Sequence, residues 1–237
     1  MAGNSRNESV DEAEVERILD AARHAENVRT RRRRDALREV FVLDQRFVLK
    51  RFTWDPGTQH PRPLWKIEHE ALSRLEGLPF PRSVGYRRRD HDKKAIMEYV
   101  RSYLPGSPVD CFGLVEARQA ARLLAAAHAR GVVTDDALKG NFLTLQDGDL
   151  GFVDLGRARV YPRPTPAMVL FVGRELAKFR RHCLEHQPEL VTAYEEAYFD
   201  ASPLKASQQG WAKRVADVTV NLRRFRKGVI QSRPDKA

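Results

Sequence analysis

The hydrophobic pattern of the chain changes once, and this change restricts its fold more than any other feature. Before residue 104, runs rich in Val, Phe and Ile predict β-strands, including a hairpin over residues 38–52 that breaks at Asp44-Gln45. From residue 114 onward, apolar residues recur at helical spacing. The connector Leu104–Pro108 contains two prolines and a glycine, which is typical of a loop between units. The sequence therefore predicts an α+β fold with two lobes, residues 1–103 and 104–237.

The remaining elements follow the same division. In the first lobe we expect two helices and two short strands, at 10–26, 64–75, 82–86 and 95–100. In the second lobe we expect four helices and a small hairpin, at 114–130, 169–186, 188–200, 207–226 and 142–153.

Composition excludes several classes of protein. The 237 residues are 42% hydrophobic and 31% charged, too apolar for a disordered chain and too polar for an integral membrane protein. The first residues are acidic and polar, unlike a secretory signal, and the two cysteines have no metal-ligand spacing. These features favour a cytoplasmic protein.

The net charge of +10 is concentrated in two segments. Seven arginines lie within residues 23–38, and nine basic residues lie beyond residue 203. Such segments attract nucleic acid, an anionic membrane face or a phosphorylated substrate. We expect no specific nucleic acid partner, because no nucleic-acid-binding motif accompanies the charge.

Five polar residues stand at positions where phosphoryl transfer needs them. They are Lys50, Glu68, Asp136, Asn141 and Asp154. A strand lysine fixed by a helix carboxylate can hold ATP phosphates, carboxylate and amide oxygens suit Mg²⁺, and a second carboxylate can orient the attacking hydroxyl. Each residue alone has an ordinary structural explanation. Their order, Lys, Glu, Asp-x4-Asn and Asp-x-Gly, is that of the protein kinases.

Residues 38–184 resemble the protein-kinase-like fold, with a small strand-rich N-lobe and a reduced helical C-lobe. The resemblance implies that Lys50 and Glu68 form an ion pair that binds ATP, with Glu70 as the rival partner. It also implies that Met97 is the gatekeeper, and that the backbones of Glu98 and Val100 meet adenine.

The second lobe carries the remaining implied roles. Asp136 would be the catalytic base, with Asp135 as its rival. Lys139 would lie near the transferred phosphate. Asn141 and Asp154 would hold Mg²⁺.

Within this fold, the chain is most similar to bacterial lipopolysaccharide core kinases, which phosphorylate heptose or Kdo sugars. The similarity lies in three segments, Val133–Phe142, Pro79–Tyr86 and Glu175–Arg181. It implies an ATP- and Mg²⁺-dependent sugar kinase that acts on the lipopolysaccharide inner core. Such an enzyme would be cytoplasmic and peripheral at the inner face of the cytoplasmic membrane.

Two departures from the kinase pattern keep other functions open. No glycine lies between Gly3 and Gly57, so the stretch Val28–Asp35 must cover the phosphates without a glycine-rich loop. Thr134 and Asp135 replace the usual His-Arg pair. The alternatives are a small atypical protein kinase or ATPase of the RIO or Bud32 type and a pseudokinase binding module.

Overall fold

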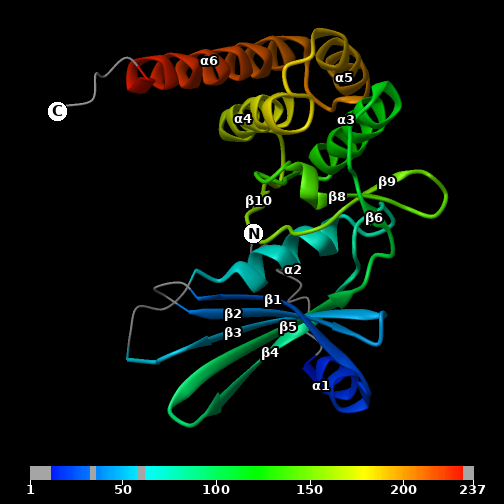
Figure 1. The fold of residues 1–237 in the computed structure, drawn as a ribbon, viewed down its shortest axis with the longest axis vertical. Helices are drawn as coiled ribbons and strands as arrows, with labels where there is room; N and C mark the ends of the chain where they lie inside the picture. Colours follow the sequence, from blue (N-terminus) through cyan, green and yellow to red (C-terminus); the bar gives the residue numbers. More distant parts are fainter. Residues whose placement is uncertain (1–11, 33–35, 58–61, 232–237) are drawn as a thin grey trace, which may run out of the picture. The chain divides into compact units, whose positions relative to one another are not determined.

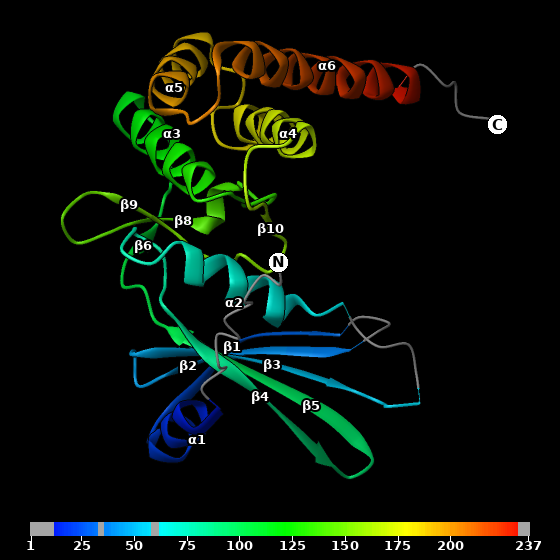
Figure 2. The ribbon, with the colours of Figure 1, turned by 180° about the vertical axis from the view of Figure 1, so that it is seen from behind.

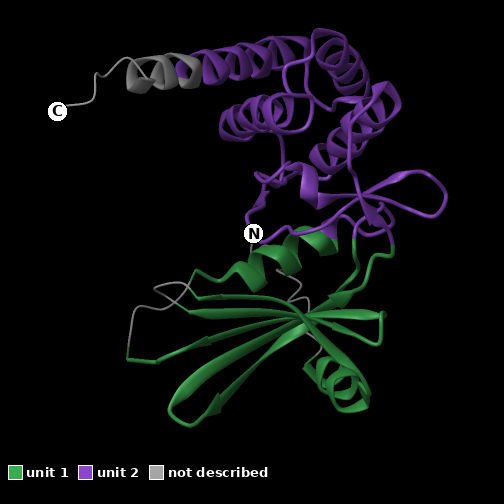
Figure 3. Cartoon of the chain, viewed as in Figure 1, with its two compact units in different colours: residues 1–73, 81–105 green, residues 74–80, 106–237 purple. Residues whose placement is uncertain are grey.

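The computed structural model describes residues 12–32, 36–57 and 62–231, with the side chains of 223–231 left out. The chain forms two compact units (Figure 3): residues 1–73 with 81–105, and residues 74–80 with 106–237. The chain passes from the first unit to the second at Pro105-Gly106, close to the predicted boundary after residue 103. The first unit holds the large sheet and the second holds most of the helices, so the fold is α+β.

Unit 1 is built on a five-stranded antiparallel sheet in the order β1-β2-β3-β5-β4. Its strands are β1 Ala25–Arg32, β2 Leu37–Leu43, β3 Phe47–Trp54, β4 Ser83–His91 and β5 Lys94–Ser102. The predicted hairpin is confirmed, and it turns at Asp44 and Gln45, which both have φ of 49°. Asp92 and Lys93 make a similar positive-φ turn between β4 and β5, as two-residue hairpin loops favour.

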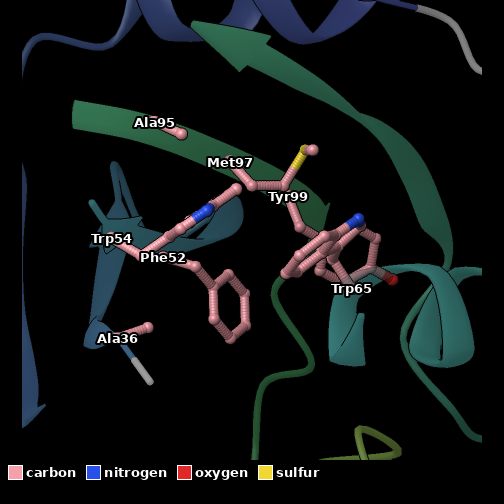
Figure 4. Packing of buried hydrophobic residues seen from close by; sticks show 7 residues of the cluster. All are labelled: Ala36, Phe52, Trp54, Trp65, Ala95, Met97 and Tyr99. Atoms are coloured by element: carbon pink, nitrogen blue, oxygen red, sulfur yellow. The ribbon is translucent and has the colours of Figure 1, made fainter. Parts of the chain in front are cut away.

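Two helices cover opposite faces of this sheet (Figures 1 and 2). Helix α2, Leu64–Arg74, packs Trp65 against Phe52 and Trp54 of β3, and the two Trp rings stack with centroids 5.9 Å apart. We call this side of the sheet the α2 face; Figure 4 shows its apolar cluster, which includes Met97 and Tyr99.

Helix α1, Glu12–Ala21, buries Val15 against the other side of the sheet, the α1 face. There it meets Leu43, Leu49, Val84 and Val100. Because side chains alternate along a strand, β3 sends Lys50 and Phe52 to one face and Leu49 to the other.

Unit 2 contains four long helices and several short strands. The helices are α3 Leu114–Ala129, α4 Pro166–His182, α5 Pro188–Ala201 and α6 Ala206–Gln231. The shorter elements are β6 Ser107–Pro108, β7 Val132–Val133, the 3-10 helix Lys139–Asn141, β8 Phe142–Thr144, β9 Leu150–Phe152 and β10 Arg159–Val160. Helix α3 packs against α5, and α4 packs against α6 at Gly173, where a Cβ would lie 2.6 Å from the carbonyl oxygen of Ala212. The buried rings of Phe142, Phe152 and Phe179 form the core beneath the β8–β9 hairpin.

The structure differs from the expectations mainly at β1. The helix predicted over 10–26 ends at Ala21, and β1 begins four residues later in a segment for which no strand was predicted. All eight residues of β1 are exposed, so they show no alternation of apolar and polar side chains. Within the described ranges, no helix is long and apolar enough to cross a membrane.

Candidate functional site

In unit 1, the structure brings Lys50 and Glu68 together. The Lys50 ammonium lies 2.9 Å and 2.7 Å from the two carboxylate oxygens of Glu68, which is only 2% exposed. Lys50 projects from the α2 face of β3 and Glu68 from the buried side of α2. The rival Glu70 is exposed on the same helix. Glu68 is therefore the carboxylate that positions Lys50.

A second cation shares this carboxylate. Arg101 Nε of β5 lies 3.3 Å from Glu68 Oε1, without the alignment of a hydrogen bond. Two cations therefore converge on one buried carboxylate in the sheet. Cations in a poorly hydrated site can interact strongly with an anionic ligand.

A hydrogen-bonded chain fixes the helix that carries Glu68. The Tyr99 hydroxyl lies 3.1 Å from Ser83 Oγ, which in turn lies 2.8 Å from His69 Nδ1 on α2. Burial, and then the nearby Glu68 carboxylate, raise the pKa of Tyr99 well above its usual value. Tyr99 therefore stays protonated and links the sheet to α2 beside the ion pair.

The structure contradicts the predicted adenine contacts. Glu98 and Val100 lie within β5, which is paired with β3 on one side and β4 on the other, so their backbone groups are already used. Glu98 instead turns its carboxylate to Arg87 Nε at 2.9 Å and Arg51 Nη2 at 3.0 Å. Met97 is buried in the α2-face cluster (Figure 4).

The predicted adenine contacts fall inside the sheet because β5 is longer than expected. The strand continues to Ser102, beyond the predicted end at Val100. Even the next amide remains in use, because Tyr103 N–H donates to the carbonyl oxygen of Arg46 at 2.8 Å. Any backbone contact with a base would therefore come after residue 103.

In unit 2, the loop before β8 holds the proposed catalytic carboxylate. The Asn141 side-chain amide donates to the carbonyl oxygen of Asp136 at 2.8 Å and closes the loop. The Asp136 carboxylate receives Lys178 Nζ of α4 at 3.2 Å, and its side chain is 14% exposed. A more distant cation, Arg157, approaches the same oxygen at 3.7 Å. Asp136 is thus an oriented carboxylate beside a lysine.

The two proposed magnesium ligands stand at one end of the β8–β9 hairpin. Val153 N–H donates to the carbonyl oxygen of Asn141 at 2.9 Å, which places Asp154 beside the loop. The Asn141 amide nitrogen donates to Asp136, so the side-chain oxygen is the atom of this amide that could accept a cation. Within the described residues no group of three or more His, Cys, Asp or Glu forms a metal site. Asn141 and Asp154 still fit Mg²⁺, which normally takes one or two protein ligands together with phosphates and water.

Asp135, the rival base, is held by its backbone. Its amide donates to Glu175 Oε2 at 2.6 Å, its carbonyl accepts Lys178 at 2.6 Å, and its φ is 51°. Its carboxylate faces Arg159 Nε at 3.4 Å. The backbone of Asp135 therefore shapes the turn that presents Asp136.

Buried Glu175 stabilises this turn through hydrogen bonds, a role that was not predicted from the sequence. It is 1% exposed, and it accepts the Thr134 hydroxyl at 2.6 Å in addition to the Asp135 amide. Its other oxygen lies 2.9 Å from His128 Nε2, and His128 Nδ1 lies 2.6 Å from the Tyr198 hydroxyl. A buried carboxylate with three donors holds the loop rigidly.

No contact among the described residues supports or opposes the role that the resemblance implies for Lys139. It begins the 3-10 helix, and it forms no ion pair with the residues that the structure describes. Lys178, three residues after Glu175 on α4, supplies the cation beside Asp136. The three-residue spacing puts both side chains on one side of the helix, a signal that could have been read from the sequence.

No protein-family model and no curated protein matches the chain. A function for this chain must therefore be inferred from the residues within each unit and their contacts.

Proposed function

We propose that this protein is a kinase-like phosphotransferase that moves the γ-phosphoryl group of ATP to an alcohol hydroxyl. The observation that carries the proposal is the Asp136 loop, where a carboxylate is fixed through Asn141 and accompanied by Lys178. The buried Lys50–Glu68 pair of unit 1 is a second, separate support. Phosphoryl transfer depends mainly on positioning and electrostatics, which is what these groups supply.

Each residue then has a defined task. Lys50, held by Glu68, binds the α- and β-phosphates. Asp136 orients the acceptor hydroxyl and takes its proton, while Lys178 stabilises the negative charge near that carboxylate. Asn141 and Asp154 would hold Mg²⁺, which would neutralise phosphate charge.

We place the proposed adenine contact in the residues that follow β5. Leu104 and Gly106 carry backbone N–H groups beyond the last paired residue of the sheet, whereas Pro105 has none. We assign the base contact to Leu104–Gly106 in place of Glu98 and Val100.

The acceptor class rests on the resemblance to the lipopolysaccharide core kinases, so heptose or Kdo of the inner core is the first acceptor to test. The assay follows radiolabel from γ-labelled ATP into purified core oligosaccharide in the presence of Mg²⁺. Label in the oligosaccharide supports the sugar kinase. Label only in a protein band would favour the atypical protein kinase.

A position at an anionic membrane face agrees with the surface of α6. Trp211, Val218 and Leu222 are 41%, 56% and 59% exposed, and their seven- and eleven-residue offsets put them on one side of the helix. Lys213 and Arg214 are exposed on the same helix, and the sequence adds Arg223, Arg224, Arg226 and Lys227. An apolar stripe with basic residues suits the interface of an anionic bilayer. We therefore propose that the protein is peripheral at the inner face of the cytoplasmic membrane.

A pseudokinase would bind ATP without transferring phosphate. A thermal shift with ATP that requires Mg²⁺, combined with transfer to an acceptor, supports the enzyme. Binding without transfer to any acceptor, in a protein that retains Asp136, would favour the pseudokinase.

A further inference from the structure

The register of β1, β2 and β3 places several cations on one face of the sheet. Arg29 lies opposite Val40, which lies opposite Lys50, and residues directly opposite each other project to the same side. In the next row, Arg31 lies opposite Arg38, which lies opposite Phe52. The α2 face therefore carries two cationic rows beside Lys50.

Side-chain contacts support this orientation. The Arg38 guanidinium lies over the ring of Phe52, 5.9 Å from its centroid, and Phe52 belongs to the α2-face cluster. Arg29 and Arg31 are both exposed. Arg32, one residue further along β1, lies opposite Leu37 and projects to the α1 face.

Like charges lie close together on this surface. Arg31 and Arg38 are directly opposite, an arrangement of like charges that weakens a strand pair. Among the described residues of β1 and β2, Glu26 is the one carboxylate on this face, in the row beyond Arg29, whereas Glu39 projects to the other face. A bound anion would relieve the repulsion.

We propose that Arg29, Arg31 and Arg38 bind the β- and γ-phosphates of ATP in place of a glycine-rich loop. This inference rests on the proposed kinase function and names further residues of the nucleotide site. The backbone of β2 is paired with both β1 and β3, so the donors on this face must come from side chains. Guanidinium groups suit the task because their paired N–H groups match phosphate oxygens.

The dimensions of the sheet are consistent with this arrangement. Adjacent strands lie about 4.8 Å apart, so Arg29 and Lys50, on the first and third strands, are separated by about 10 Å between backbones. Two long side chains can close over a polyphosphate across that span. The arginines would hold its distal part while Lys50 binds the phosphates nearer to the nucleoside.

The chain provides a matched control for the test. Arg31→Gln and Arg29→Gln each remove one charge from the α2 face, and Arg32→Gln removes the same charge from the α1 face of the same strand. Binding of Mg-ATP, inorganic tripolyphosphate and adenosine is measured by titration calorimetry. We expect about tenfold weaker binding of ATP and tripolyphosphate for each of the first two variants, and less than about twofold change for Arg32→Gln. Adenosine binding should not change in any of them.

If Arg31→Gln and Arg32→Gln bind ATP with equal affinity, the inference is overturned. This holds whether both variants keep the wild-type affinity or both lose it. Exposed edge-strand substitutions leave the core intact, and unchanged thermal melting of each variant checks this. A wild-type protein that binds no ATP would instead refute the proposed function. A wild-type protein that binds ATP and transfers phosphate, with all three variants binding equally, would refute only the arginine site.

Discussion

The buried carboxylate of Glu68 should matter more for stability than the lysine that it holds. Glu68 is 2% exposed and is shared by Lys50 and Arg101. Glu68→Ala leaves both cations in a buried site without the carboxylate that they share. Removing one partner of a buried ion pair typically costs about 3–5 kcal/mol, and we expect a loss of that size in the free energy of unfolding.

Lys50→Met should behave differently. It leaves Glu68 beside Arg101, so one cation and one carboxylate remain, and the flexible thioether fills much of the volume of the lysine stem. Breaking a buried pair is costly when it leaves an uncompensated charge, but here Arg101 still lies 3.3 Å from the Glu68 carboxylate, so we expect a change within about 1 kcal/mol. Both variants should lose ATP binding, because the ammonium that we propose binds phosphate is absent or misplaced.

The assay is urea unfolding followed by tryptophan fluorescence. Trp54 and Trp65 lie in the α2-face cluster and report on unit 1 (Figure 4), whereas Trp211 belongs to unit 2. Lys66→Ala, an exposed change on the same helix, is the control and should stay within about 0.5 kcal/mol of wild type. An equal loss of stability in Lys50→Met and Glu68→Ala would refute the reasoning, because the lysine would then be structural.

Three further predictions concern unit 2. Lys178→Met should lower kcat about 100-fold with little change in the KM for ATP, since it removes charge stabilisation beside Asp136; a raised KM at constant kcat would contradict this role. Burial raises the pKa of the Cys183 thiol to about 12 from 9.0, so native protein should react with a thiol reagent at the exposed Cys111 alone, and the second thiol should react only on unfolding. Since the folded-state pKa is the higher one, the Cys183 contribution to stability is complete below about pH 9 and is lost as the pH rises toward 12. The double change Trp211→Ser and Leu222→Ser should weaken binding to anionic vesicles about tenfold in co-sedimentation while kcat for a soluble acceptor is retained; unchanged binding would remove α6 from the membrane contact.

Much of the fold could be predicted because residue patterns within single segments mark its helices and strands. The α3 helix and the β2–β3 hairpin lie within two residues of their predicted ends, since apolar periodicity and turn residues mark them. Strand β1 was missed because its eight residues are exposed and charged, and only pairing with β2 makes them a strand. Strand pairing is a tertiary effect that residue patterns along one segment cannot show.

The same difference between local patterns and tertiary contacts applies to the candidate site. The Lys50–Glu68 pair follows from residue order, but the contacts of Lys178 and Glu175 with the Asp136 loop span about 40 residues of sequence and needed the structure. The prediction of the adenine contacts was wrong for a related reason. The true end of β5 depends on its pairing with β3 and β4, which extends the strand past Val100.

The central claim is that Asp136, and not its neighbour, serves as the base for phosphoryl transfer. The direct measurement is the rate of γ-phosphoryl transfer from Mg-ATP to core oligosaccharide by Asp136→Asn and by Asp135→Asn, each with its affinity for ATP. We expect Asp136→Asn to lose transfer by at least about 100-fold with ATP affinity retained, and Asp135→Asn, whose backbone contacts persist, to lose about tenfold or less. Normal transfer by Asp136→Asn, or a greater loss in Asp135→Asn, would contradict the account.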